Sequence, residues 1–112
     1  MRQQLPPVRE NISLEFDHLN HDGKAFHYTA TIGFYPDGRV GEVFLGSRKV
    51  GTDVDIAAKD AAIAVSLALQ YGCPLEHLVS AFLRRADGAP EGPLGTLLDL
   101  VLKEVKDLKV VP

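Results

Sequence analysis

The chain has 112 residues, of which 46% are hydrophobic and 24% charged, with a formal net charge of -3. This length supports one buried core, and the balance of apolar to charged residues is that of a globular protein rather than a disordered one. The acidic balance lacks the basic footprint of general nucleic-acid binding, and the single cysteine excludes an internal disulfide.

No apolar stretch reaches the roughly 20 residues that span a bilayer, because Asp60, Ser66 and Gln70 interrupt the longest ones. The opening residues, MRQQLPPVREN, lack the apolar segment and the cleavage site of a secretory signal. We therefore expect a cytoplasmic protein without membrane contact. Residues 1–10 are expected to form a flexible N-terminal arm, and residues 11–112 a single domain.

Alternating apolar and polar residues predict strands in the first half of the chain. The alternation covers residues 12–17 and, over a longer run, residues 26–35. Residues 20–23 and 36–38 contain the asparagine, aspartate and glycine that favour tight turns. A third strand is expected over residues 39–45, which completes a three-stranded antiparallel meander with one apolar and one polar face.

From residue 52 onwards the spacing of apolar residues becomes helical. Thr52 can cap the first helix with Asp55 three residues on, a variant of the capping box, and residues 53–71 contain neither proline nor glycine. Gly72 and Pro74 indicate a corner into a second helix, and Pro93 opens a third. The predicted fold class is α+β, with a three-stranded antiparallel β-meander followed by three α-helices packed on one sheet face.

Two segments carry a family resemblance. GEVFLG at residues 41–46 ends the meander, and SLALQYG at residues 66–72 leads into the second helix. Over residues 27–83 the chain resembles the TSCPD domain found near the C-terminus of adenosylcobalamin-dependent ribonucleotide reductases. The resemblance implies a domain outside the catalytic barrel, so that the radical chemistry, the active-site cysteines and the cobalamin site belong to other parts of those enzymes.

The resemblance further implies a stand-alone relative of an accessory domain. Nucleotide reduction uses a thiyl radical and a dithiol, and Cys73 alone cannot supply three sulfurs. We therefore expect no enzyme, no catalytic residue and no cofactor. The expected function is a non-catalytic accessory, regulatory or interaction module, with a ribonucleotide reductase subunit as the candidate partner.

A basic loop between the third strand and the first helix is the candidate ligand site. Its residues are Gly46, Ser47, Arg48, Lys49, Gly51 and Thr52. Free backbone N–H groups and the helix dipole favour an anion there, although the lysine that a Walker A loop places before its hydroxyl residue is missing. The alternative function is a small nucleotide- or phosphate-binding protein that uses residues 46–53. An ordinary strand-to-helix connection is the other interpretation.

Other polar residues admit both a functional and a structural interpretation. Asp60 falls among apolar helix positions, so we expect a buried carboxylate that meets either a ligand or interface, or backbone N–H groups or an arginine. Cys73 precedes a helix and is either reactive or simply packed. His18 and His21 could hold a metal, or the turn between them could aim them apart. We expect no metal site.

Self-association is also expected. Alanines at six positions of the first helix let a neighbour approach closely, which predicts that this helix is the most buried one. The open edges of a three-stranded sheet and the apolar third helix favour a partner, and the default arrangement is a symmetric homodimer. RNA binding by the polar sheet face is disfavoured, because His27 and Tyr35 lie on it without a basic stripe.

Overall fold

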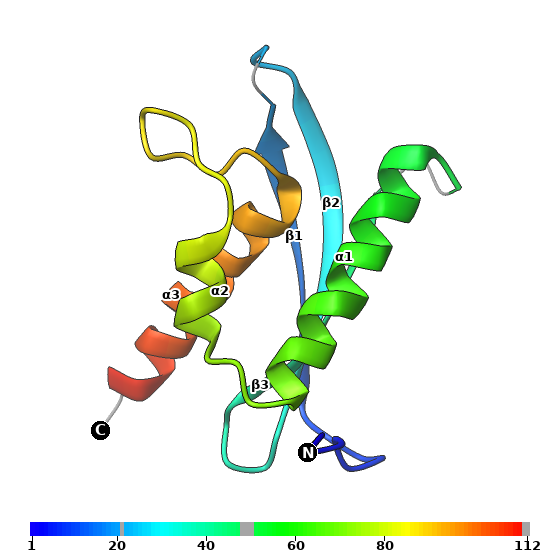
Figure 1. Ribbon diagram of the computed structural model, residues 1–112, viewed down its shortest axis with the longest axis vertical. Coiled ribbons are helices and arrows are strands. Elements are labelled where there is room, and N and C mark those ends of the chain that lie inside the picture. Colours follow the sequence, from blue (N-terminus) through cyan, green and yellow to red (C-terminus); the bar gives the residue numbers. More distant parts are fainter. Residues whose placement is uncertain (21, 48–50, 111–112) are drawn as a thin grey trace.

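The computed structural model describes the backbone of residues 1–20, 22–47 and 51–110, and the side chains of these ranges as far as residue 105. Three strands precede three helices: β1 (Asn11–Leu19), β2 (Ala25–Phe34), β3 (Val40–Ser47), α1 (Asp53–Gln70), α2 (Leu75–Ala81) and α3 (Pro93–Val110). The strand order is β1-β2-β3, and both pairs are antiparallel. The predicted α+β class and element order are confirmed (Figure 1).

One face of the sheet forms the core. Phe16 lies opposite Tyr28, Ile32 lies opposite Val43, and all four side chains are buried. Because successive strand residues point to opposite faces, these side chains belong to a single face. The helices that cover it contribute Ala58, Ala62, Val65 and Leu69 from α1 and Leu94, Leu97, Leu98 and Val101 from α3. The prediction that the helices pack on one sheet face is therefore also confirmed.

The first helix is not the most buried one, contrary to expectation. The deepest helical side chains are Leu97 and Leu98 of α3, whereas α1 leaves Ile56, Ile63 and Leu67 exposed. Of the six alanines of α1, only Ala58 and Ala62 are buried in the core, whereas Ala57 and Ala64 are exposed, and α1 lies beside β3 at one margin of the sheet (Figure 1). A helix in that position has only one side to cover, so its other sides stay open to solvent.

Glycines form the turns where the sequence predicts them. Gly38 between β2 and β3 has a φ of 91°, and Gly72 after α1 has a φ of 99°, a region that favours glycine. After Gly72, the backbone N–H of Cys73 donates to the carbonyl of Ala68 at 2.9 Å, which is the hydrogen bond that closes a helix with a left-handed residue. Within the described residues, no helix is both long and apolar enough to cross a membrane.

Candidate functional site

A buried carboxylate organises the connection between β3 and α1. Asp55, in the first turn of α1, is 1% exposed. Its two oxygens accept the backbone N–H groups of Ser47 and Gly51 at 3.0 Å each and pair with Lys59 at 2.9 Å. The backbone N–H of Asp55 donates to the hydroxyl of Thr52 at 3.2 Å, which makes Thr52 the N-cap. The bond from Ser47, then those from Lys59 and Gly51, hold the pKa of Asp55 well below its ordinary value.

These contacts bear on the predicted anion site. Backbone N–H groups from both sides of the loop, at Ser47 and Gly51, already donate to a protein carboxylate. An anion at this helix N-terminus would lie beside the negative charge of Asp55, which weakens its attraction. Arg48 and Lys49 lie outside the described residues, so binding of a nucleotide or phosphate stays a prediction. Saturable nucleotide binding that disappears in the double variant Arg48→Ala with Lys49→Ala would support it.

Asp60 is exposed, so the expectation of a buried carboxylate at this position is wrong. The apolar residues that flank it on the helix surface, Ile63 among them, are themselves exposed. The side of α1 that faces the sheet consists of small residues such as Ala58 and Ala62. Hydrophobicity therefore predicts the wrong side of α1 as the buried one. The buried carboxylate of α1 is Asp55, and its signal in the sequence is its place three residues after the capping Thr52.

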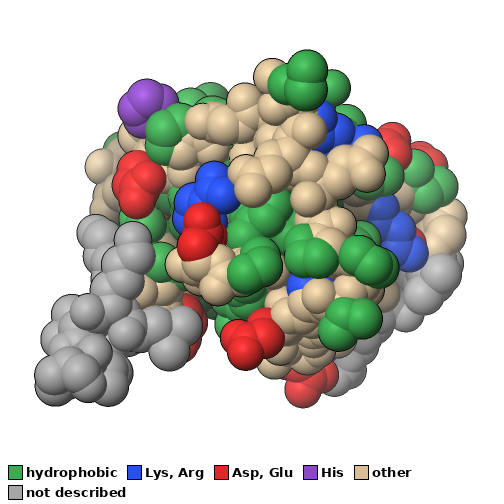
Figure 2. Space-filling model, turned by 90° about the horizontal axis from the view of Figure 1, so that it is seen from below, with side chains coloured by type: hydrophobic (Ala, Val, Ile, Leu, Met, Phe, Trp, Pro, Cys, Tyr) green, Lys and Arg blue, Asp and Glu red, His purple; other side chains and the backbone are tan. Residues whose placement is uncertain are grey.

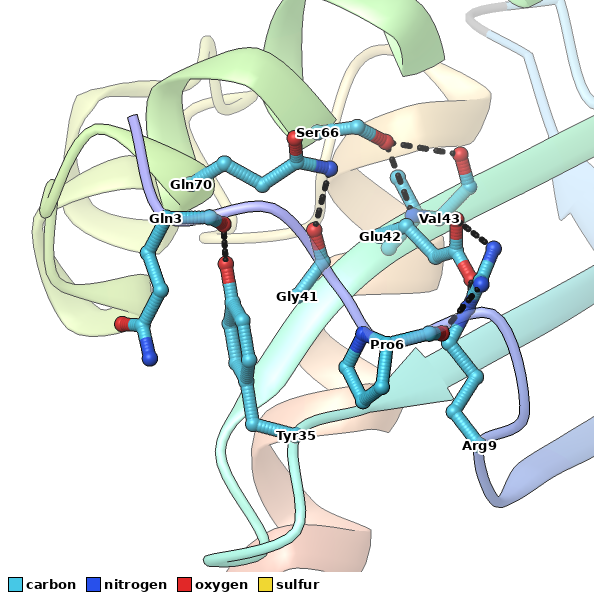
Figure 3. A network of polar contacts seen from close by, with 9 residues as sticks. All are labelled: Gln3, Pro6, Arg9, Tyr35, Gly41, Glu42, Val43, Ser66 and Gln70. Atoms are coloured by element: carbon cyan, nitrogen blue, oxygen red, sulfur yellow. Dashed lines mark hydrogen bonds and ion pairs between the residues drawn. The ribbon is translucent and has the colours of Figure 1, made fainter. Parts of the chain in front are cut away.

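Polar side chains of α1 hydrogen-bond to the outer edge of β3 (Figure 3). The hydroxyl of Ser66 accepts the backbone N–H of Val43 at 2.9 Å and lies 3.1 Å from its carbonyl oxygen. The side-chain amide of Gln70 donates to the carbonyl of Gly41 at 3.0 Å. Together with the contact from Asp55, these bonds occupy outward-facing backbone groups along β3. This edge of the sheet is thus covered by a helix instead of lying open.

The N-terminal arm contacts the end of α1 and the turn that follows β2. The backbone N–H of Gln3 donates to the carbonyl of Gln70 at 2.8 Å, and the hydroxyl of Tyr35 donates to the carbonyl of Gln3 (Figure 3). A Cβ atom at Gly41 would lie 2.6 Å from Leu5 and 2.7 Å from Tyr35, so a glycine there lets the arm approach. The flexibility expected for residues 1–10 stays a prediction. Removal of the contacts of Gln3 with Tyr35 and Gln70 would test it.

An ion pair holds the following part of the arm to the sheet. The guanidinium of Arg9 donates to both carboxylate oxygens of Glu42 and to the carbonyl of Pro6 at 2.8 Å (Figure 3). Glu42 is a buried residue of β3 whose side chain lies on the sheet face away from the helices. A buried carboxylate needs such a partner. The arm therefore covers one end of a sheet face that the helices leave open.

His18 joins β1 to the beginning of α3. The ring is buried, with Nδ1 2.9 Å from the hydroxyl oxygen of Thr96 and Nε2 3.0 Å from the carbonyl oxygen of Glu91. A proton on Nε2 lets the neutral ring donate to that carbonyl and accept from the threonine. Burial lowers the pKa of His18. His21 lies outside the described residues, and among the residues described no group of three or more potential ligands could hold a metal ion.

Cys73 is a partly exposed free thiol at the corner between α1 and α2. Its Sγ lies 3.7 Å from the carbonyl oxygen of Pro74, and its backbone N–H closes α1. Both contacts are local. They fit the packed interpretation of this cysteine, in which the residue belongs to the helix corner.

An apolar surface runs along the outer side of α1. We define the α1 flank as Ile56, Ile63 and Leu67 of α1 with Phe44 of β3; Ile63 is 57% and Phe44 54% exposed. An open groove of about 420 Å³ lies between β3 and α1, lined in part by Phe44, Lys59 and Ile63. On the face drawn in Figure 2, hydrophobic side chains reach the surface between basic and acidic ones that do not gather by sign. Sequence reasoning missed this surface, because apolar helical residues were assigned to the core.

The fold and its surfaces define a small α+β domain with a helix along one sheet edge, and comparison with known proteins gives its family. The model of the TSCPD domain matches residues 11–109, and the chain belongs to that family. This confirms the resemblance that residues 41–46 and 66–72 indicated. No solved structure shows a significant match.

The curated relatives are much longer proteins. A vitamin B12-dependent ribonucleotide reductase of Rhodopirellula baltica is 36% identical over 81 residues, which cover 72% of this chain and 7% of the relative. The protein of the same name from Bradyrhizobium diazoefficiens is 40% identical over 83 residues, covering 65% and 6%. That of Streptantibioticus cattleyicolor is 39% identical over 82 residues, covering 73% and 13%. The chain thus spans only a small part of the relatives it matches.

Proposed function

We propose that this TSCPD domain is a non-catalytic accessory or interaction module that associates with a ribonucleotide reductase chain. The observation that carries the proposal is the extent of the match. The relatives contain the corresponding segment as 7%, 6% and 13% of chains named vitamin B12-dependent ribonucleotide reductase. In each relative this segment is part of the same chain as a much larger protein. Contacts between domains of one chain resemble contacts between separate proteins, so a domain of this family can bind such a protein without a covalent link.

The internal contacts support a non-catalytic function. Among the described residues, the buried carboxylates Asp55 and Glu42 and the buried His18 each have partners within the fold. Asp55 and His18 hold elements together, and Glu42 holds the N-terminal arm. A general acid or base instead needs to face a substrate. The polar atoms of these three groups are thus engaged in contacts that stabilise the fold.

The α1 flank supports an interaction function. A contiguous apolar surface on a folded domain is a common mark of a binding site. Complete burial of a fully exposed isoleucine or phenylalanine contributes on the order of 1.5–3 kcal/mol, and a side chain that is about half exposed gains roughly half of that. The side chains of Ile63 and Phe44, each more than half exposed, would gain most from a partner. We place the contact with the reductase on this flank.

Isothermal titration of the purified chain into a purified vitamin B12-dependent reductase tests the proposal. Ile63→Asp is expected to weaken binding by more than about tenfold, because it puts a charge into the apolar contact. Val54→Asp is the matched control: Val54 is also 57% exposed and lies nine residues earlier, on the opposite side of the helix. Absence of binding by the unaltered chain, or equal weakening by both variants, would refute the proposal.

We also propose that in the absence of a reductase the α1 flank pairs two copies in a symmetric homodimer. Ile56, Ile63 and Leu67 lie along one side of α1, and Ile63 is 57% and Phe44 54% exposed, so pairing of two flanks would bury apolar surface that now faces solvent. Sedimentation velocity should detect dimers that Ile63→Asp dissociates. If the unaltered chain remains monomeric at millimolar concentration, the proposed homodimer is excluded.

A cytoplasmic location completes the proposal. The free thiol of Cys73 suits a reducing compartment, and ribonucleotide reductases supply the candidate partner. Cell fractionation with an antibody against the chain tests the location. Recovery of the chain outside the cytoplasmic fraction would contradict it.

A further inference from the structure

The two edges of the sheet differ. Side chains of α1 reach the outward-facing backbone groups of β3 at Gly41, Val43 and Ser47. On the other side, β1 has β2 as its only strand neighbour within the part of the chain that the structure describes. The β3 edge of the sheet is therefore covered by a helix. The β1 edge is accessible to another strand if the backbone N–H and C=O groups of β1 point away from β2.

Hydrogen bonding gives that direction. The backbone N–H of Phe34 donates to the carbonyl of Glu10 at 3.0 Å, just beyond the β1–β2 register. Bonded positions alternate in an antiparallel pair, so the N–H and C=O groups of Ser13, Glu15 and Asp17 point away from β2. Within the described ranges, no hydrogen bond involves these outward groups. The edge of β1 is thus open for strand pairing.

The side chains along this edge are acidic. Glu15 and Asp17 lie on the sheet face that the helices do not cover, and their side chains are 70% and 64% exposed. Both contact His27 of β2, at 3.1 and 2.9 Å. An added strand would place its own side chains directly beside these carboxylates, about 5 Å away. Basic residues at alternate positions of that strand would complement them.

The same charges disfavour a second copy at this edge. Two β1 strands paired about a two-fold axis centred at Glu15 would set that carboxylate opposite its own copy. Like charges placed directly opposite destabilise an antiparallel pair. On the helix-covered face, Ile12 and Leu14 leave apolar surface at the edge. The alternate residues of an added strand would extend the core there.

We propose that the β1 edge binds an extended segment of another protein in which Lys or Arg alternates with β-branched apolar residues, added as a fourth strand. Main-chain hydrogen bonds to Ser13, Glu15 and Asp17 supply affinity, and the carboxylates select the charge. This site is independent of the proposed reductase contact, which lies on the α1 flank.

Nuclear magnetic resonance titration with synthetic peptides tests the site. A seven-residue peptide of alternating Lys and Val is the probe, and a peptide of alternating Glu and Val is the charge control. A Lys-Val peptide with N-methyl groups on alternate residues controls for strand pairing, because it lacks the N–H groups that would face β1. We expect shifts in residues 11–19 with the first peptide, at least tenfold weaker binding of the second, and no binding of the third.

Variants separate the edge from general charge attraction. Ser13→Pro removes an outward N–H and should abolish binding while leaving the bonds to β2 intact, which an unchanged melting temperature would verify. Glu15→Lys with Asp17→Lys should reverse the preference between the Lys and Glu peptides. Asp60→Lys with Glu104→Lys, two exposed helical positions, makes the same change in net charge and should leave the preference unchanged.

Three results would overturn the proposal. The first is no binding of the Lys-Val peptide at millimolar concentration. The second is equal binding of the N-methylated peptide, and the third is shifts that centre on residues other than 11–19. If Ser13→Pro unfolds the chain, the double variant Glu15→Lys with Asp17→Lys tests the site by itself. The site is refuted if this variant still prefers the Lys-Val peptide to the Glu-Val peptide.

Discussion

Asp55 and Asp60 lie in one helix and have opposite environments. Asp55 is enclosed by backbone N–H groups and Lys59, whereas Asp60 is exposed. Helical periodicity places both residues correctly on α1, but hydrophobicity alone does not tell which side faces the sheet. Alanine is small enough for close packing and only weakly apolar, so hydrophobicity predicts that the isoleucine-rich side is buried, whereas the alanine side faces the sheet.

Replacement of Asp55 by Ala should destabilise the fold, since the backbone N–H groups of Ser47 and Gly51 would lose their acceptor. We expect the melting temperature to fall by more than about 5 °C. Calorimetry measures this change, with Asp60→Ala as the control, which should leave the melting temperature nearly unaltered. Equal effects of the two variants would contradict the structural importance of Asp55.

The pKa of Asp55 also predicts the acid limit of stability. Because the folded chain holds this pKa below the ordinary value of 3.8, the carboxylate contributes stability that is fully present above pH 3.8. That contribution is lost as the pH falls further and the carboxylate becomes protonated. Unfolding at successive pH values should therefore show a steeper loss below pH 3.8 in the unaltered chain than in Asp55→Ala.

His18 predicts a second pH dependence. Burial lowers its pKa from the ordinary value of 6.5, so the unfolded chain takes up the proton first as the pH falls. The neutral ring thus contributes stability above pH 6.5 that diminishes below it. Between pH 7.5 and 5.5, the melting temperature of the unaltered chain should fall more than that of His18→Gln. Parallel curves for the two proteins would show that His18 is not buried in its neutral form.

Among the elements, the strands, the helices and their order follow from local patterns. Period-two alternation, the glycines of the turns, the N-cap Thr52 and the closing Gly72 are all signals within a few residues. The contacts between elements are not predictable in this way. The covering of the β3 edge by Ser66 and the contact between Gln3 and Gln70 join residues far apart in the chain.

Ser66 is expected to stabilise the contact between α1 and β3. Ser66→Ala would leave the backbone N–H of Val43 without its acceptor, at a cost of about 1–3 kcal/mol. Ser80→Ala is the control, because Ser80 is exposed and its hydroxyl donates to the carbonyl of His77 one turn earlier. Urea denaturation measures both changes. A cost for Ser66→Ala no larger than that for Ser80→Ala would show that water replaces the hydroxyl.

The N-terminal arm gives a test of its own at this scale. Removal of residues 1–9 would take Arg9 from Glu42 and leave that buried carboxylate unpaired, so we expect a lower melting temperature. Hydrogen exchange should also become faster at the β2–β3 turn and at the end of α1. An unchanged melting temperature after truncation would support the flexible arm that the sequence predicts.

For the molecule as a whole, the structure is two-layered, with helices on one sheet face and, on the other, polar side chains together with the exposed Phe44. Its radius of gyration is 14.0 Å, against about 13 Å for a compact domain of this length. The α1 flank and the β1 edge are the two surfaces on which we propose that partners bind. Both are defined by the exposure and charge of their side chains, which sequence patterns predict poorly because apolar residues are interpreted as core.

Co-sedimentation of the fluorescently labelled chain with a vitamin B12-dependent ribonucleotide reductase tests the interaction function most directly. In analytical ultracentrifugation we expect the labelled chain to move with the reductase peak, and Ile63→Asp to release it into the slow peak while Val54→Asp does not. A chain that sediments apart from the reductase at every concentration tried would contradict the account.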